Sequence, residues 1–125
     1  MKDKTIATGI SRQNEALSAL MHKKDEVINE VEAIMSDKAR NRASLSQAQM
    51  KDFTRFTRVC ENNTRELSLV MAQIHEAISP KALHITSGEF HKKLSYVRER
   101  QKKATAMLRE MVEVGEGVIP ELARR

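Results

Sequence analysis

Apolar residues recur along the chain with alternating spacings of three and four residues, which is the repeat of one face of an α-helix. The clearest stripe covers positions 53–77 and begins with Phe53 and Phe56. Stripes of the same kind cover positions 90–111 and, less regularly, 17–35. The pattern therefore predicts an all-α protein built from three long amphipathic helices.

Local signals predict where these helices start. Ser46 followed by Gln49 has the spacing of a capping box, in which each side chain bonds the backbone N–H of the other residue. Thr86 followed by Glu89 repeats this spacing, and Ser11 is a weaker N-cap. We therefore expect helices to begin near these three hydroxyl residues.

Proline and glycine predict where the helices stop. Pro80 should end the second helix, because proline disfavours helical backbone in the residue before it. Gly115 and Gly117, followed by Pro120, should end the third. Short connections favour antiparallel neighbours, which gives an up-down-up, coiled-coil-like bundle. The predicted organisation is a flexible tail over 1–10, a bundle over 11–115 with helices at 11–37, 46–79 and 86–115, and a C-terminal tail over 116–125.

A polar residue interrupts each stripe near its midpoint: Lys24, Asn63 and Gln101. The midpoints of three antiparallel helices lie at the same height, so we expect these residues to meet in one layer. A buried polar layer would fix the register of the bundle. Alternatively, Lys24 extends its ammonium to solvent or belongs to a functional site.

Composition narrows the class of protein. The 125 residues suit one domain, and three phenylalanines, one tyrosine and no tryptophan argue against a β-sandwich or barrel. The single cysteine, Cys60, excludes an internal disulfide. No stretch approaches the roughly 20 apolar residues of a membrane span, and no signal peptide is recognisable. We expect a cytoplasmic protein that does not enter a membrane.

The sequence contains no motif that supports catalysis or metal binding. Its four histidines form no HExxH motif, and no CxxC pair is present. Cys60 has no base partner in a recognisable motif, so it is best interpreted as a small core residue. The glycines do not form a phosphate-binding loop. We therefore expect a non-enzymatic protein without a metal or cofactor.

The charge distribution raises nucleic acid as an alternative partner. The formal net charge is +5, and basic residues concentrate over positions 36–65 and 81–109. Such a balance suits a polyanionic partner. Acidic residues at 25–32 and 110–116 could neutralise part of the charge inside an antiparallel bundle. The candidate phosphate-binding residues are Arg55, Arg58, Lys92, Lys93, Arg100, Lys102 and Lys103.

Methionines and wide stripes indicate a protein-binding surface. Most of the seven methionines fall on or beside the apolar stripes, and methionine adapts to irregular apolar partners. The first two stripes are wider than three helices need, which leaves an apolar groove or a self-association surface. Val118, Ile119 and Leu122 could cover that groove. The candidate lining residues, which could equally be core, are Leu67, Val70, Met71, Ile74, Met107, Leu108 and Met111.

One segment resembles a known family. Asn62-Asn63-Thr64-Arg65-Glu66-Leu67, followed by Met71, Ile74 and Ile78, resembles the asparagine-then-leucine stretch of the hook-associated-protein chaperones. These belong to the flagellar and type III export chaperones, which are small three-helix proteins. The segment covers under a fifth of the chain, its asparagines are adjacent rather than spaced, and no glycine-tyrosine tail follows. The resemblance implies an apolar groove that holds the terminal helix of an export substrate.

The sequence therefore predicts a helical-bundle interaction protein. It would bind an amphipathic helix of a protein partner, or its own copy, in a groove between long helices. An export chaperone or adaptor is the concrete version of this expectation. The alternative is a basic helical accessory protein that associates with nucleic acid.

Overall fold

Three long helices make up the described part of the chain. The computed structural model describes the backbone of residues 2–78 and 87–125 and the side chains of residues 8–78 and 88–125. The helices are α1 (Lys2–Arg40), α2 (Gln47–Ala77) and α3 (Ser87–Leu122), and these ranges contain no strand. At 1.5 Å per residue they are about 45–60 Å long. The predicted all-α, three-helix architecture is confirmed.

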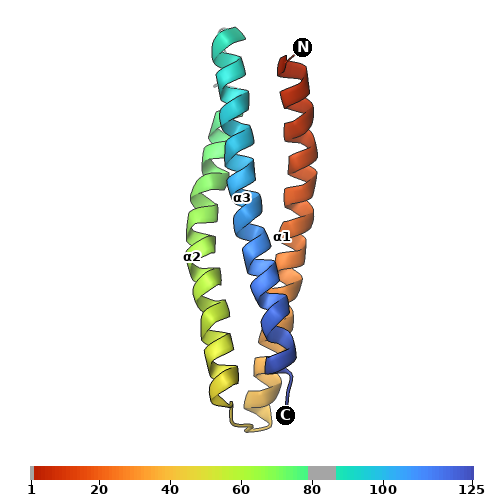
Figure 1. Ribbon diagram of the computed structural model, residues 1–125, viewed down its shortest axis with the longest axis vertical. Coiled ribbons are helices and arrows are strands. Elements are labelled where there is room, and N and C mark those ends of the chain that lie inside the picture. The colour runs from red at the N-terminus through yellow and green to blue at the C-terminus, as the bar shows by residue number, and fades with distance from the viewer. Residues whose placement is uncertain (1, 79–86) are drawn as a thin grey trace.

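The helix α3 lies between the other two (Figure 1). The α2 helix runs antiparallel to both α1 and α3, which makes α1 and α3 parallel to each other. Both α1 and α2 pack along α3, whereas the described backbones of α1 and α2 barely approach each other. The bundle is therefore organised around α3 as a shared central element.

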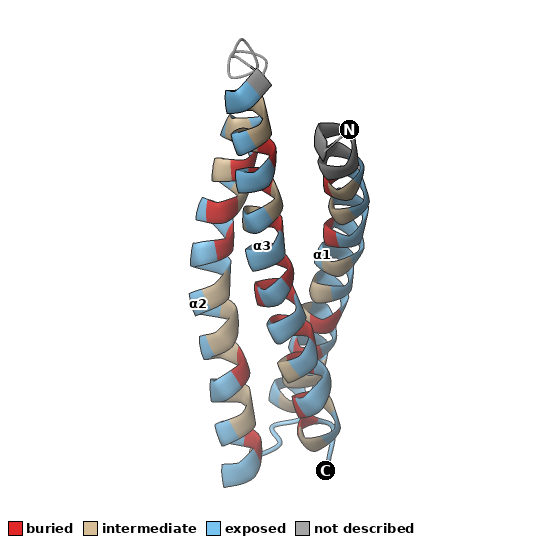
Figure 2. Cartoon of the chain, turned by 45° about the horizontal axis from the view of Figure 1, so that its top comes forward, coloured by how far each residue is buried: buried red, intermediate tan, exposed pale blue. Residues whose placement is uncertain are grey.

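The core forms two clusters along the length of α3. Figure 2 shows buried positions on α3 facing both neighbouring helices. One cluster joins Ile10 and Leu17 of α1 to positions 67–74 of α2 and 94–108 of α3. The other joins Val27 and Val31 to Phe56 and the end of α3. Each outer helix is thus held to α3 at two heights.

The start of α2 is set by a local signal. The backbone N–H of Gln49 donates to Ser46 Oγ at 3.1 Å, and the Ser46 N–H donates to Gln49 Oε1 at 3.0 Å. The predicted capping box is therefore confirmed. The α2 helix ends at Ala77, and the predicted signals at Pro80 and Thr86 lie outside the described residues.

The two chain ends differ from the prediction. The α1 helix begins at Lys2, so residues 2–10 are helical rather than a flexible tail. Contacts with α3 hold the end of this segment, because Ile10 is buried and Arg98 Nη1 donates to the carbonyl oxygen of Gly9 at 3.2 Å. The expectation that the first helix starts near Ser11 was therefore wrong.

The α3 helix continues past its predicted end to Leu122. Neither Gly115 nor Pro120 stops it, although proline in a helix costs about 3 kcal/mol. Val118 and Leu122 are fully buried, and each buried aliphatic side chain contributes about 1.5–3 kcal/mol. Tertiary burial thus outweighs the local stop signals, and the predicted tail over 116–125 is mostly helix.

The predicted polar layer does not form. Gln101 Nε2 donates to the carbonyl oxygen of Ile10 at 3.1 Å and to Asn14 Oδ1 at 2.6 Å. Asn14 precedes Lys24 by ten residues, which corresponds to about 15 Å along α1. Asn63 Nδ2 instead donates to the carbonyl oxygen of Met107. The prediction failed because it took midpoints from helices whose true ends lie elsewhere.

Candidate partner-binding surfaces

The structure places most of the predicted groove residues in the core. Met71 is half-buried, and the other six are buried between α2 and α3 or beneath α1. Their first role is therefore to hold the helices together. The buried six are Leu67, Val70, Ile74, Met107, Leu108 and Met111.

The tail residues that could cover a groove are also part of the bundle. Val118 and Leu122 are fully buried in the cluster around Phe56, and Ile119 packs against that cluster while half-buried. They belong to the last turns of α3. The tail therefore closes the core near the α1–α2 connection as a continuation of the helix.

A different set of apolar residues is incompletely covered. On α1, Met21, Ile28 and Met35 recur every seven residues and so share one face. On α2, a second row consists of Phe53, Cys60, Met71 and Ile78. Their spacings of 7, 11 and 7 residues place them on one face of the helix. Both rows are half-buried or exposed. We call these residues and Lys24 the α1–α2 seam, whose members are Met21, Lys24, Ile28, Met35, Phe53, Cys60, Met71 and Ile78.

Side-chain contacts place Ile28 and Met35 of the first row beside Phe53 and Cys60 of the second. A Cβ atom on Gly115 would meet both Val27 of α1 and Phe56 of α2. These two residues therefore lie at the same height along the bundle. Ile28, Met35, Phe53 and Cys60 all pack against the cluster that contains Val27 and Phe56. Met21 and Ile78 are 36% and 42% exposed. The seam is therefore an apolar strip that the bundle covers only in part.

Lys24 lies near Cys60 within the seam. The Lys24 side chain is only 18% exposed, and its Nζ lies 2.8 Å from Asp25 Oδ1. Burial raises the pKa of the Cys60 thiol above its ordinary value, and the nearby Lys24 ammonium opposes that shift. The thiol is therefore protonated at neutral pH, which disfavours a nucleophilic role. The seam thus contains a cation among apolar side chains.

The predicted phosphate-binding residues do not form one patch. Arg55 and Arg58 flank Phe56, which lies level with Gly115, whereas Arg100 Nη1 reaches Gln73 Oε1. Positions 100 and 115 are about 22 Å apart along α3. The remaining candidates, Lys92, Lys93, Lys102 and Lys103, belong to the Arg100 end.

Part of the basic charge on α3 is already engaged. Lys103 Nζ lies 2.8 Å from Glu66 Oε1 of α2. The Arg100 guanidinium lies 5.7 Å from the centre of the Tyr96 ring, within the range of a cation–π contact. This pairing involves Glu66 of α2, and within the described residues no acidic residue of 25–32 or 110–116 forms the ion pair with a basic residue of α2 that the sequence had suggested.

A straight basic row occupies the outward face of α2. Lys51, Arg55, Arg58 and Arg65 have spacings of 4, 3 and 7 residues and are all exposed. Helical periodicity could have found Lys51 and Arg65, which sequence reasoning about dense basic stretches missed. We call these four residues the α2 basic row.

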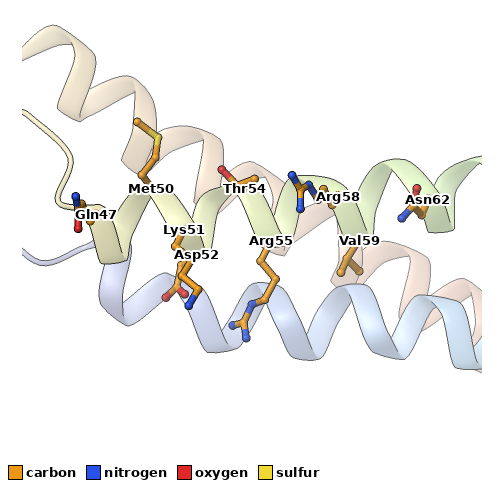
Figure 3. Close-up of a pocket in the computed structure, with 9 residues that line it drawn as sticks. All are labelled: Gln47, Met50, Lys51, Asp52, Thr54, Arg55, Arg58, Val59 and Asn62. Atoms are coloured by element: carbon orange, nitrogen blue, oxygen red, sulfur yellow. The ribbon is translucent and has the colours of Figure 1, made fainter.

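The first part of this row lines a surface hollow. Figure 3 shows that the lining side chains all project from α2, and Asp52 is the acidic residue among them. Thr54 and Asn62 add polar groups, and Met50 adds an exposed apolar one. The lining residues are Gln47, Met50, Lys51, Asp52, Thr54, Arg55, Arg58, Val59 and Asn62.

The described residues contain no group of three or more histidine, cysteine, aspartate or glutamate side chains that could hold a metal ion. None of the described helices combines the length and apolarity that crossing a bilayer requires. No protein-family model, curated protein or solved structure matches the chain. The export-chaperone resemblance therefore gains no family support beyond the three-helix architecture.

Proposed function

We propose that the protein is a non-enzymatic helix-binding protein that receives an amphipathic helix of a protein partner along the α1–α2 seam. One observation carries this proposal. The α1 and α2 helices pack on α3 and barely on each other, so their facing apolar rows are left half-covered. An export chaperone or adaptor that holds a helix of its client is the concrete form of this function.

A guest helix on the seam would complete a four-helix arrangement. In such bundles each helix packs against two neighbours. The α3 helix has α1 and α2 as its neighbours, and a guest opposite α3 would have the same two. It would cover Met21, Ile28 and Met35 on one side and Phe53 and Met71 on the other. The flexible methionines allow the seam to fit apolar side chains of different shapes.

Lys24 favours a guest that carries a carboxylate near its centre. This ammonium is largely withdrawn from water, and its ion pair is with the exposed neighbour Asp25. A covering helix would desolvate Lys24 further, which is costly unless an acidic group pairs with it. Symmetric docking of a second copy, centred on the seam, would instead bring two Lys24 side chains together. The charge therefore favours a different protein as the occupant.

Fluorescence anisotropy with two labelled designed peptides tests the proposal. Each peptide has about six helical turns and one leucine stripe, and they differ in a central Glu or Lys. We expect the Glu peptide to bind and the Lys peptide to bind at least about tenfold more weakly. The Lys24→Gln variant should remove most of this preference.

Matched variants locate the site. Met21→Glu and Met71→Glu should each weaken binding of the Glu peptide by at least about tenfold, because each places a charge in the seam. Leu69→Glu is the control, since Leu69 is 59% exposed and lies on the outward face of α2. Circular dichroism checks that all variants are folded. The proposal would be overturned if the Glu peptide did not bind, or if Leu69→Glu weakened its binding as much as the seam variants do. It would also be overturned if the free protein had a doubled mass that depends on Met21.

A further inference from the structure

The α2 basic row is a linear array of cations. Lys51 and Arg65 are separated by 14 residues of a continuous helix, which is about 21 Å. Arg55 and Arg58 lie between them on the same face. Asp52, Glu61 and Glu66 flank the row but do not interrupt it. The helix therefore holds four positive charges in a fixed line.

These charges are free to meet a partner. Within residues 8–78 and 88–125, no carboxylate forms an ion pair with any of the four. The contrast is with Lys103, which Glu66 engages, and with Lys23, whose Nζ lies 3.9 Å from Glu116 Oε1. Three of the four are arginines, whose planar guanidinium groups can bond two oxygens of one phosphate. The row is thus suited to oxyanions.

We propose that the α2 basic row binds the phosphate backbone of a nucleic acid. A straight row of cations fits a polymer that repeats its charge along a line, as the phosphodiester backbone does. Thr54 and Asn62 in the adjoining hollow can donate further hydrogen bonds to phosphate oxygens. The inference concerns a surface apart from the α1–α2 seam and does not rest on it.

The same face contains little that could read bases or enter a lipid surface. Phe56 is buried and Phe53 half-buried, so neither offers a free stacking platform. The exposed apolar residues near the row are Met50 and Leu69, which lie at its two ends rather than in a continuous apolar face. Binding should therefore depend on backbone charge and not on base sequence.

A salt titration with a labelled 20-base-pair duplex and the matching single strand tests this proposal. The logarithm of the association constant should fall linearly with the logarithm of salt concentration, with a slope of about −0.9 per phosphate contact on duplex DNA. Four contacts predict a slope of about −3 to −4. Two duplexes of unrelated sequence should give the same affinity.

Two double variants that remove the same number of positive charges distinguish the effect of the α2 basic row on binding from the effect of the protein's net charge. The double variant Arg55→Gln/Arg58→Gln should reduce the magnitude of the slope by about 2 and weaken duplex binding at low salt by at least about tenfold. The control Lys92→Gln/Lys102→Gln removes the same charge from exposed residues of α3 and should leave the slope unchanged.

Three results would overturn the inference. The first is no binding of the duplex or the single strand at low salt, and the second is an equal effect of the two double variants on duplex binding. The third is binding to polyglutamate or phosphatidylserine vesicles that depends on the row, without binding to either nucleic acid. Peptide binding at the seam is measured separately, so either proposal can fail while the other stands.

Discussion

At the scale of single residues, Gly115 shows how a packing requirement overrides a local preference. A Cβ atom at this position would overlap Val27 Cγ1 of α1 and lie 2.9 Å from Phe56 Cε1 of α2. The missing side chain lets both helices place apolar groups against the backbone of α3. Gly115 therefore serves as a close-approach site inside a helix rather than as a helix end.

Replacing Gly115 and Gly117 of α3 by alanine should have opposite effects. Gly115→Ala should lower the free energy of unfolding by about 1–3 kcal/mol, since overpacking outweighs the gain in helix propensity. Gly117→Ala should raise it by up to about 1 kcal/mol, because nothing lies within 4 Å of the added Cβ. Urea unfolding measures both. A stabilised Gly115→Ala variant would contradict the close approach of the three helices.

Cys60 predicts a pH dependence of stability. Burial raises the pKa of its thiol in the folded chain above the unfolded value of about 8.5. The unfolded chain therefore loses this proton first as pH rises. Relative to Cys60→Ala, the wild type should keep its full stability below about pH 8 and lose part of it from about pH 8.5 upward. Urea unfolding from pH 7 to 9.5 compares the two proteins; parallel curves would show that the folded thiol titrates normally.

At the scale of elements, one side chain joins the start of α2 to the end of α3. Gln49 completes the capping box with Ser46. Its Nε2 also donates to the carbonyl oxygens of Glu121 at 3.0 Å and Arg124 at 2.8 Å. Lys38 Nζ donates to the same Arg124 oxygen at 2.7 Å. The C-terminal end of the chain, from the last turn of α3 to Arg124, is therefore fastened to both other helices.

Gln49→Glu separates these two roles. Glutamate keeps an acceptor for the Ser46 N–H but loses both donors and places a carboxylate beside two carbonyl oxygens. We expect the free energy of unfolding to fall by about 1–3 kcal/mol. Gln47→Glu is the control, because it adds the same charge at an exposed position in the first turn, where the helix dipole favours it. Thermal unfolding measures both, and similar melting temperatures would exclude a role for the α3 contacts.

Helix ends were predictable where the signal is local and not where it is long-range. The capping box at Ser46 depends on residues three apart, so the sequence contains all of it. The part of α1 just before Ser11 contacts Arg98 of α3 through Gly9, and the extension of α3 depends on burial of Leu122 beneath other helices. Gly115 and Pro120 have the composition of a stop signal, and only the packed bundle shows that they are tolerated.

At the scale of the whole molecule, the same limit applies to the candidate site. Periodicity correctly assigned Leu67, Val70 and Ile74 to an apolar face, but coverage of a face depends on the direction from which the other helices arrive. Because α1 and α2 both dock on α3, those residues are buried while Met71, one position from Val70, stays half-covered. The relative height of α1 and α2 is likewise a property of the assembled bundle.

A double-mutant cycle tests that relative height. Val27 and Phe56 should be coupled, because both side chains meet over Gly115. We expect Val27→Ala and Phe56→Leu to differ from additivity in unfolding free energy by at least about 0.5 kcal/mol. Val70 lies about 21 Å from Phe56 along α2, so Val27→Ala and Val70→Ala should add within about 0.5 kcal/mol. Additivity in the first pair would mean that α1 and α2 are not level at Gly115. The rows Met21–Ile28–Met35 and Phe53–Cys60–Met71 would then not face each other, and the α1–α2 seam would lose its geometric basis.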